Sequence, residues 1–389
     1  MNSNKDQPAS EKTTDAPLAG LKVVELARIL AGPWAGQTLA DLGADVIKIE
    51  SPAGDDTRQW GPPNIQQQDD ESAAYYHSCN RGKRSMVSDL KNPEDLAYVK
   101  ELIGDADVLI ENFKVGGLAS YGLDFDSLHA VNPGLIYCSI TGFGQTGPYA
   151  SRAGYDFMIQ GMSGIMDLTG EADGSPQKIG VAFTDVFTGL YSVVAIQSAL
   201  LLRQQSGLGQ HIDMALFDCM TSVLANQAMN YLSTGKAPKR MGNKHPNICP
   251  YETVEASDGH IIIACGNDGQ FQRLCDSLHL TDAKSDDRFI SNASRVQNRE
   301  HLMILIKEKT SLLSKADLLS ALEQAVVPAG PINTVEEAFN DPQFQHRKLQ
   351  IDNNGVPGIR TPIQFGTTPM VAKSGAPALG ADNKARFNA

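Results

Sequence analysis

Short apolar runs alternate with helical stretches over the first third of the chain. An apolar run at 21–26 is followed by a helical stretch at 33–42, which has proline at its start and glycine directly after its end. A second apolar run occupies 44–50. Proline suits the first turn of a helix and glycine its end, so these segments predict a βαβ unit.

The same alternation continues to about residue 140. Asn92 is a helix N-cap residue followed by proline and two acids, which favour a first turn, and the helix ends at Gly104. Further apolar runs lie at 107–111 and 135–140. Strands that alternate with helices predict an α/β fold with a mostly parallel sheet, whose ligands bind at the carboxyl ends of the strands.

The second half of the chain has a different pattern. A helical stretch at 221–232 precedes 233–250, which is rich in Gly, Pro, Asn and Lys and is typical of a linker or active-site loop. Short apolar runs at 252–254 and 260–265 flank a Ser-Asp-Gly turn, which predicts two antiparallel strands. Helices are predicted after them at 270–278, 299–312 and 315–325. This combination indicates a smaller α+β domain.

One carboxylate stands alone in an apolar region. Asp185 is the single acid between Gly180 and Arg203, where an apolar, strand-like segment at 179–183 leads into a long helix. A buried aspartate needs a partner or a chemical role. Thr184 or Asp185 could cap the helix, and from these residues alone capping and catalysis both remain open.

Composition and charge exclude several classes of function. A net charge of −12 argues against nucleic acid and anionic membranes as partners, because both need clustered Lys and Arg. The 6 cysteines are scattered without a CxxC pair, which predicts free thiols in a reducing compartment and neither a disulfide framework nor a metal site. Without a signal peptide, or a run near the roughly 18 apolar residues of a membrane span, a cytoplasmic protein is expected.

A glycine-rich segment imitates a nucleotide-binding turn. Residues 142–147 match the GxGxxG pattern after a predicted strand, but residues 148–153 separate the match from any helix. The first strand-to-helix turn, at 27–32, lacks the pattern. We therefore do not expect a nicotinamide cofactor. Gly142 and Gly144 favour either close approach of the backbone to a long thin ligand or a tight turn.

Several segments together resemble one enzyme family. In chain order they are 18–25, 31–33, 139–148, 153–164, 167–171 and 203–210. Between Leu18 and Pro369 the chain resembles the class III coenzyme A transferases, which include formyl-CoA transferase and carnitine CoA-transferase. The resemblance implies that Asp185 is the catalytic nucleophile, and that the substrates are an acyl-CoA thioester and a free carboxylic acid. It implies no tightly bound cofactor.

The resemblance also implies which residues contact the coenzyme. They are Ala31, Lys83, Arg84, Asn112, Phe113, Gly142 and Phe143. An ordinary solvated loop is an equally good interpretation of Lys83 and Arg84. The chain departs from formyl-CoA transferase where that enzyme has Gln, Arg, Arg, Lys and Tyr, and here the residues are Leu30, Ser51, Ser120, Thr141 and Phe143. Formyl-CoA and oxalate are therefore not the expected pair, and the coenzyme phosphates must find other cations, such as Lys48, Arg58, Lys83 and Arg84.

Two further segments indicate the kind of acid that accepts the coenzyme. Residues 54–63 and 240–252 are similar to family members that use dicarboxylic acids. The second carboxylate of such an acid needs a cation, and the candidates are Arg58, Arg240, Lys244 and His245. Each of them could instead be a surface charge. Residues 240–247 form the candidate active-site lid.

Three other functions remain as alternatives. An acyl-CoA racemase of the same superfamily would use a His and Asp pair, but the chain has Gly154-Tyr-Asp156 where those enzymes usually have Gly-His-Asp. A nicotinamide-dependent oxidoreductase is disfavoured by the misplaced glycines. A CoA-binding protein without catalysis would have no need for the isolated Asp185.

The resemblance completes the predicted architecture. It implies an α/β fold with a large Rossmann-like domain, a smaller α+β domain, and ring-shaped monomers interlocked in a homodimer. The predicted segments are a disordered tail (1–16), the large CoA-binding domain (17–225), a linker and active-site loop (226–250), the small domain (251–328) and a return to the large domain (329–389).

Overall fold

A computed structural model describes residues 16–67, 70–368, 374–384 and 386–387. Apart from Ala16, the predicted tail lies outside these residues. The chain divides into two compact units. The first comprises Met1–Ile165, Ile179–Asn226 and Gln345–Ala389, and the second comprises Met166–Lys178 and Gln227–Phe344. The predicted domains had the return to the large unit beginning at 329 and kept 166–178 within that unit.

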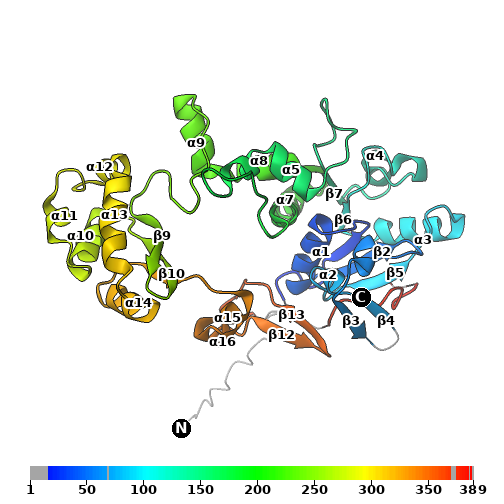
Figure 1. Cartoon of the computed structure of the whole chain (residues 1–389). Coiled ribbons are helices and arrows are strands. Elements are labelled where there is room, and N and C mark those ends of the chain that lie inside the picture. The colour runs from blue at the N-terminus through cyan, green and yellow to red at the C-terminus, as the bar shows by residue number, and fades with distance from the viewer. Residues whose placement is uncertain (1–15, 68–69, 369–373, 385, 388–389) are drawn as a thin grey trace, which may run out of the picture. The chain divides into compact units, whose positions relative to one another are not determined.

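A six-stranded parallel sheet forms the centre of the first unit (Figure 1). Every pair of neighbouring strands is parallel, and the strand order is β5-β2-β1-β6-β7-β8. The strands are β1 (Lys22–Glu25), β2 (Asp45–Glu50), β5 (Arg84–Val87), β6 (Val108–Glu111), β7 (Ile136–Thr141) and β8 (His211–Ala215). This is the order of a Rossmann-like domain, whose chain reverses direction along the sheet between β1 and β6.

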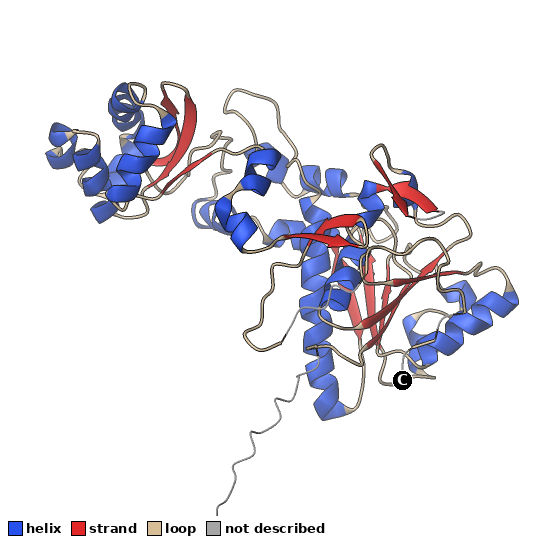
Figure 2. Cartoon of the chain, turned by 90° about the horizontal axis from the view of Figure 1, so that it is seen from below, coloured by secondary structure: helices blue, strands red, loops and turns tan. Residues whose placement is uncertain are grey.

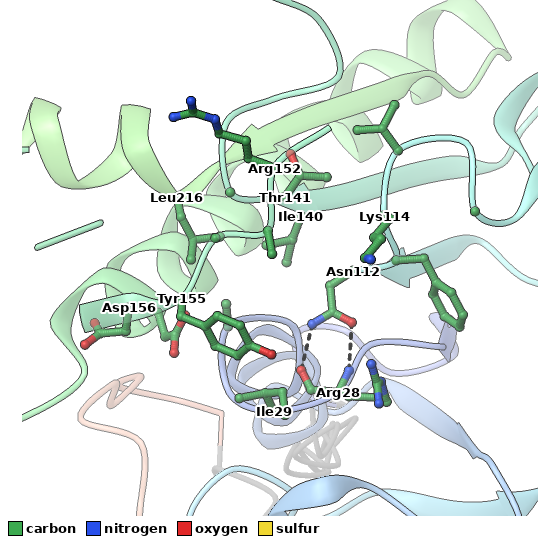
Figure 3. A pocket seen from close by; sticks show the side chains of 18 of the residues that line it. Arg28, Ile29, Asn112, Lys114, Ile140, Thr141, Arg152, Tyr155, Asp156 and Leu216 are labelled. Atoms are coloured by element: carbon green, nitrogen blue, oxygen red, sulfur yellow. Dashed lines mark hydrogen bonds between the residues drawn. The ribbon is translucent and has the colours of Figure 1, made fainter. Parts of the chain in front are cut away.

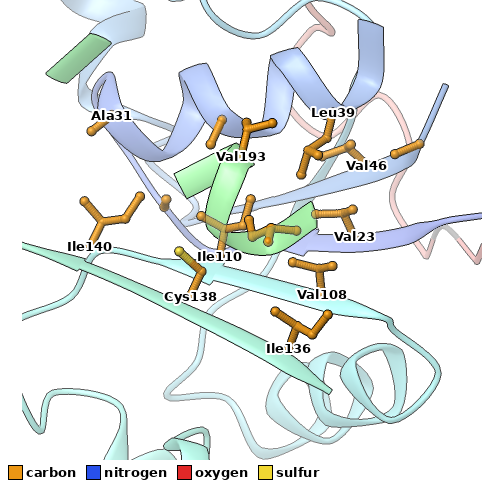
Figure 4. Packing of buried hydrophobic residues seen from close by; sticks show 14 of the residues in the cluster. Val23, Ala31, Leu39, Val46, Val108, Ile110, Ile136, Cys138, Ile140 and Val193 are labelled. Atoms are coloured by element: carbon orange, nitrogen blue, oxygen red, sulfur yellow. The ribbon is translucent and has the colours of Figure 1, made fainter. Parts of the chain in front are cut away.

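Helices cover both faces of the sheet (Figure 2). On one face α1 (Ala31–Asp41) and α7 (Phe183–Ser206) pack on strand residues such as Val23 and Ile110 (Figure 4). On the other face α3 (Pro93–Gly104) and α4 (Phe125–His129) pack on Val24 and Leu109. Neighbouring strand residues therefore enter opposite cores, as expected for a sheet that is buried on both sides.

The remaining elements of the first unit follow, together with α6 and α9, which begin in the first unit and lie mostly in the second. They are η1 (Asp56–Gln59), β3 (Asn64–Gln67), β4 (Asp70–Ala73), α2 (Ala74–His77), η2 (Ala119–Tyr121), α5 (Asp156–Met162), α6 (Ile165–Leu168), α8 (Leu216–Ser222), α9 (Ala225–Thr234), β12 (Gln350–Asn353) and β13 (Val356–Ile359). The strands β3 and β4 form one antiparallel hairpin, and β12 and β13 form another.

The second unit contains a three-stranded antiparallel sheet. Its order is β11-β10-β9, and the predicted pair of strands is confirmed as β9 (Tyr251–Ala256) and β10 (Gly259–Ala264). The helices pack around one apolar core that includes Phe271 and Leu302. The other elements are β11 (Ala329–Pro331), α10 (Asp268–Ser277), α11 (Thr281–Ser285), α12 (Asn292–Gln297), α13 (Arg299–Thr310), α14 (Lys315–Gln324), α15 (Val335–Asn340) and α16 (Pro342–His346).

Two sequence-based predictions of secondary structure are wrong. Residues 179–182 form no strand, and α7 begins at Phe183. The helix predicted at 221–232 is instead two helices, α8 and α9, which are separated next to Ala225, whose φ is +46°. That left-handed conformation does not occur inside a helix, so the chain turns there.

One described helix, α7, is long and apolar enough to cross a membrane by length and composition alone. In this structure its buried side packs on α1 and the sheet through Val193 and Ile196. All six cysteines are buried and free.

Candidate active site

A cavity at the carboxyl edge of the sheet lies where the strand order reverses. The loop after β1 and the loop after β6 both line a cavity of about 380 Å³ (Figure 3). In parallel α/β sheets this point is the usual ligand site, because two neighbouring loops diverge there. All of the residues that line the cavity belong to the first unit.

The cavity brings together five of the predicted site residues. They are Asp185, Ala31, Asn112, Phe113 and Gly142. They come from α7, the start of α1, the loop after β6 and the loop after β7. Segments that are distant in the sequence therefore meet at one cavity.

Asp185 is the buried acid of this cavity. It lies in the first turn of α7, and the residue is 8% exposed. Among the described residues no group donates a hydrogen bond to its carboxylate. Burial, and secondarily the charge of Asp156, raise the pKa of Asp185 to about 7. A helix N-terminus favours the charged form, but burial outweighs that effect here.

Asp156 holds the start of α7 in place. Its Oδ1 accepts a hydrogen bond from the backbone N–H of Thr184 at 2.9 Å, and its Oδ2 accepts one from the Gln160 amide at 2.8 Å. Gln160 in turn accepts from the N–H of Ile179 at 2.9 Å. The alternative that Thr184 or Asp185 caps the helix is therefore not the arrangement found, since Asp156 of α5 accepts from the first turn and leaves the Asp185 carboxylate to the cavity.

The glycine-rich segment after β7 has a packing explanation. A Cβ on Gly142 would lie 2.6 Å from the Cα of Gly154, so the two backbones touch and neither position tolerates a side chain. Phe143 packs against the core and makes an edge-on contact with Tyr149, with ring centroids 5.4 Å apart. Gly142 lines the cavity, whereas Phe143 supports its wall from behind.

The predicted phosphate cations already have carboxylate partners. Lys83 is fully buried, with its Nζ 2.8 Å from Glu25 Oε2, and Arg84 forms an ion pair with Asp45 at 2.6 Å. Arg58 lies 2.8 Å from Glu50 across the face of a tyrosine ring. None of these three lines the cavity. Lys48 belongs to the same buried network.

The other predicted substrate residues belong to the second unit. Arg240 bonds the carbonyl of Asp167 at 2.8 Å and its carboxylate at 3.0 Å, and Lys244 pairs with Glu300 at 3.0 Å. His245 stacks on Tyr251, with ring centroids 5.1 Å apart. Burial, with a smaller contribution from the Arg299 charge, lowers the pKa of His245.

The cavity contains cations that sequence reasoning did not identify. Arg28, Lys114 and Arg152 all line it. Arg28 pairs with Asp56 at 2.7 Å, Arg152 lies over the ring of Tyr149, and Lys114 has no carboxylate partner among the described residues. Arg28 and Lys114 follow β1 and β6 closely, so the rule that strand-end loops carry ligand groups could have found them.

Tyr75 is a further residue that the sequence did not single out. It lies on α2, and burial, followed by the charge of Asp185, raises the pKa of its phenol. An unionised phenol near an acid is a hydrogen-bond donor.

Among the described residues no cluster of His, Cys, Asp and Glu could hold a metal ion. The cavity combines a buried carboxylate with backbone groups, cations and apolar walls.

Comparison with known proteins is consistent across sequence and structure. The sequence profile of CoA-transferase family III matches residues 18–383. A succinate–glutarate CoA-transferase of Agrobacterium fabrum is 58% identical over 94% of this chain and 93% of its own length. The human succinyl-CoA:glutarate CoA-transferase is 40% identical over 96% of this chain and 86% of its own length.

A solved structure has the same fold. The crystal structure of a CAIB/BAIF family protein from Brucella suis superimposes with a TM-score of 0.86 and is 64% identical, covering 95% of this chain and 97% of that one. Both kinds of comparison span nearly the whole chain, so the match includes both units.

Proposed function

The chain belongs to CoA-transferase family III and is a CoA-transferase, and we propose that Asp185 is the nucleophile through which it moves coenzyme A from a thioester to a carboxylic acid. The observation that carries this proposal is the buried carboxylate of Asp185, without hydrogen-bond donors, facing the cavity at the sheet reversal. A poorly solvated carboxylate is a stronger nucleophile than one that water surrounds.

The residue type fits the four steps of such a transfer. The Asp185 carboxylate attacks the thioester carbonyl, the C–S bond breaks, and CoA thiolate leaves a mixed anhydride. The thiolate then attacks the aspartyl carbonyl, which releases the donor acid and forms an aspartyl-CoA thioester. The acceptor carboxylate displaces the thiolate to give a second anhydride. Attack of the thiolate on the acceptor carbonyl completes the new thioester and restores Asp185.

Coenzyme A is proposed to occupy the cavity against Ala31, Asn112, Phe113 and Gly142. The cations that line it, above all Lys114, are better placed for coenzyme phosphates than Lys83 and Arg84, which carboxylates already neutralise. For Lys83, Arg84 and Phe143 we propose a supporting role behind the site. The cavity volume of about 380 Å³ suits the thin end of a long ligand.

A dicarboxylate is the proposed acceptor or donor acid. The relatives from Agrobacterium and human are named for succinate and glutarate, and both match this chain over at least 94% of its length. Arg58 is neutralised by Glu50 in the buried network. Arg152, which lines the cavity, is the proposed ligand of the distal carboxylate. For Arg240 and His245 of the second unit, contact with this acid stays a prediction.

Trapping the covalent intermediate tests the mechanism. Protein incubated with succinyl-CoA is treated with hydroxylamine or borohydride and digested, and mass spectrometry locates the modified peptide. Modification at Asp185, absent in Asp185→Asn, is the expected result. Transfer without modification at Asp185 would assign the nucleophile elsewhere, and exchange of an α-proton without transfer would indicate a racemase.

The assembly and compartment are proposed with the same function. A stripe of exposed apolar side chains runs along α7, including Val194 at 58% and Leu201 at 63% exposure. A second copy of the chain would cover it in a homodimer. The six free cysteines favour a reducing, cytoplasmic location.

A further inference from the structure

The turn after β1 carries an unusual backbone conformation. Ile29 has a φ of +73°, in the left-handed region, and it lines the cavity. A β-branched residue is strained there, at a cost of about 1–3 kcal/mol, and such a conformation persists only when its surroundings enforce it. The next residues, Leu30 and Ala31, also line the cavity. The conformation of Ile29 therefore determines where this wall begins.

The buried carboxylate of Asp55 accepts a hydrogen bond from the strained residue. The N–H of Ile29 donates to both oxygens of Asp55, each at 3.3 Å, and Asp55 is 1% exposed. Thr57 donates to the same carboxylate through its backbone N–H at 3.0 Å and its hydroxyl at 2.8 Å. Asp55 therefore makes a bond to the turn that is separate from its bonds to its own segment.

A buried lysine fixes Asp55 and the turn together. The Nζ of Lys48 lies 2.9 Å from Asp55 Oδ2 and donates to the carbonyl of Ala27 at 2.8 Å. Its third bond is to Glu25 at 3.0 Å, and the side chain is fully buried. All three ammonium donors are therefore used, and two of the bonds hold the turn on either side of Arg28.

The outer side of the turn is held by Asn112. Its Oδ1 accepts from the N–H of Arg28 at 2.9 Å, and its Nδ2 donates to the Arg28 carbonyl at 2.7 Å (Figure 3). Side chains from β2, from the loop that follows β2, and from the loop after β6 thus bond three consecutive residues of the turn. The backbone of this turn is therefore held by side chains from other segments rather than by hydrogen bonds within the turn.

We propose that Asp55, oriented by Lys48, is a positioning residue that keeps Ile29 left-handed and thereby fixes the cavity wall for the acyl-CoA. The inference rests on the proposed function, in which that cavity holds the coenzyme. Asp55 does not line the cavity. It acts through the backbone of Ile29, and its effect should depend on how strongly residue 29 resists a positive φ.

Glycine at position 29 provides the test, because glycine adopts a positive φ without strain. Asp55→Asn is made alone and in the Ile29→Gly background, and transfer kinetics are measured for all four chains. Asp55→Asn keeps one oxygen but loses the charge that pairs with Lys48, so the side chain is no longer held against the Ile29 N–H. We therefore expect it to reduce kcat/KM for the acyl-CoA about 30-fold when Ile29 is present. The reduction should be threefold or less in the Ile29→Gly background. The KM for the acyl-CoA should change more than the KM for the acid.

A matched control separates positioning from general stability. Thr57→Val removes a hydroxyl bond to the same Asp55 oxygen but leaves the Ile29 N–H bond, so it should leave the kinetic constants within twofold. Equal losses from Asp55→Asn in both backgrounds, or no loss in either, overturn the proposal. If Asp55→Asn does not fold alone, it must fold in the Ile29→Gly background, and failure of both also overturns it.

A binding measurement distinguishes this inference from the proposed function. Calorimetry with CoA reports occupancy of the cavity without catalysis. A wild-type chain that binds no CoA contradicts the proposed function. Normal CoA binding by the wild type, combined with equal losses in both backgrounds, contradicts only the role of Asp55.

Discussion

At the scale of single residues, the site depends on an acid that the fold keeps dry. Asp185 is buried, and it lies near a second acid, Asp156, which already accepts two hydrogen bonds. Both effects disfavour charge on Asp185. The ionised, reactive carboxylate therefore lowers the stability of the folded state, which is common at catalytic positions.

Replacing the nucleophile should abolish transfer. Asp185→Ala and Asp185→Asn are expected to lower turnover at least about 1,000-fold, because the other carboxylate that lines the cavity, Asp156, already accepts hydrogen bonds through both of its oxygens. CoA affinity by calorimetry should fall less than about threefold. Asp218→Asn, which changes an exposed acid in the first turn of α8, is the control. Turnover near the wild-type rate in Asp185→Ala would remove this residue from the mechanism.

The raised pKa of Asp185 predicts a pH dependence of activity. Attack requires the ionised form, so kcat/KM should fall about tenfold per pH unit below about 7. Asp156→Asn removes a neighbouring negative charge but keeps an oxygen for the Thr184 N–H. The acidic limb should therefore move to lower pH in this variant. A limb that stays fixed would show that the Asp156 charge does not act on Asp185.

The raised pKa of Asp185 also predicts that folding stability depends on pH. Ionisation of Asp185 favours activity but lowers the free energy of unfolding. The folded pKa of about 7 exceeds the ordinary value of 3.8, so between these values the folded state binds the extra proton and loses stability as pH rises. Asp185→Asn has no such loss. At pH 8 it should be more stable than the wild type by about 2–4 kcal/mol in urea unfolding. The difference should vanish near pH 4, and a constant difference across this range would contradict the argument.

At the scale of elements, segments with a strong local signal were predictable. The helix α3 was predicted from Asn92, proline and two acids, and the Asn92 side chain does accept from the N–H of Glu94 at 2.9 Å. The strand β5, which contains Arg84 and Ser85, was missed because its polar residues are paired by partners remote in sequence. No periodicity reports such partners.

The cap of α3 gives a direct test of local prediction. Asn92→Ala should destabilise α3 by about 1 kcal/mol, since two N–H groups lose their acceptor. Hydrogen exchange of the α3 amides should become about fivefold faster, whereas Asn92→Asp should exchange at nearly the wild-type rate. Unchanged exchange in Asn92→Ala would mean that packing on the sheet, rather than the cap, determines the stability of this end.

The start of α7 shows where local reasoning fails. The apolar residues 179–182 have the composition of a strand, yet they form none. Their conformation is determined by Gln160 and Asp156 on α5, which bond Ile179 and Thr184. Asp185 was identifiable as an isolated acid, but its lack of donors and its acidic neighbour are consequences of tertiary structure.

At the scale of the whole molecule, the alternation of strands and helices predicted the sheet, and the strand order explains the site. The reversal between β1 and β6 opens the cavity, which is why Asn112 and Ala31 meet there. The cations were predicted less well. Lys83 and Arg58 carry charges that look available in sequence, but the folded chain buries them against carboxylates. Charge pairing across the fold is not readable from spacing.

The exposed stripe on α7 predicts the oligomeric state. Leu190, Val194 and Leu201 lie within one face of the helix and are 42%, 58% and 63% exposed. We expect light scattering to report a dimer for the wild type. Val194→Glu with Leu201→Glu should weaken it, because charges would be buried without partners. Val131→Glu, at an isolated position that is 77% exposed, is the control. A monomeric wild type with native circular dichroism would contradict the prediction.

Subunit exchange tests the finer expectation that the two protomers interlock. Dimers that are merely in contact dissociate and re-form at a rate set by their interface, so two differently tagged preparations should mix over hours at low concentration. Interlocked protomers cannot separate without unfolding. Native mass spectrometry should then find no mixed dimers after several days at 25 °C, and it should find them after joint denaturation and refolding. Mixed dimers that form without denaturant would show that the protomers associate through surfaces alone, and the threaded arrangement would be wrong even though the dimer itself is right.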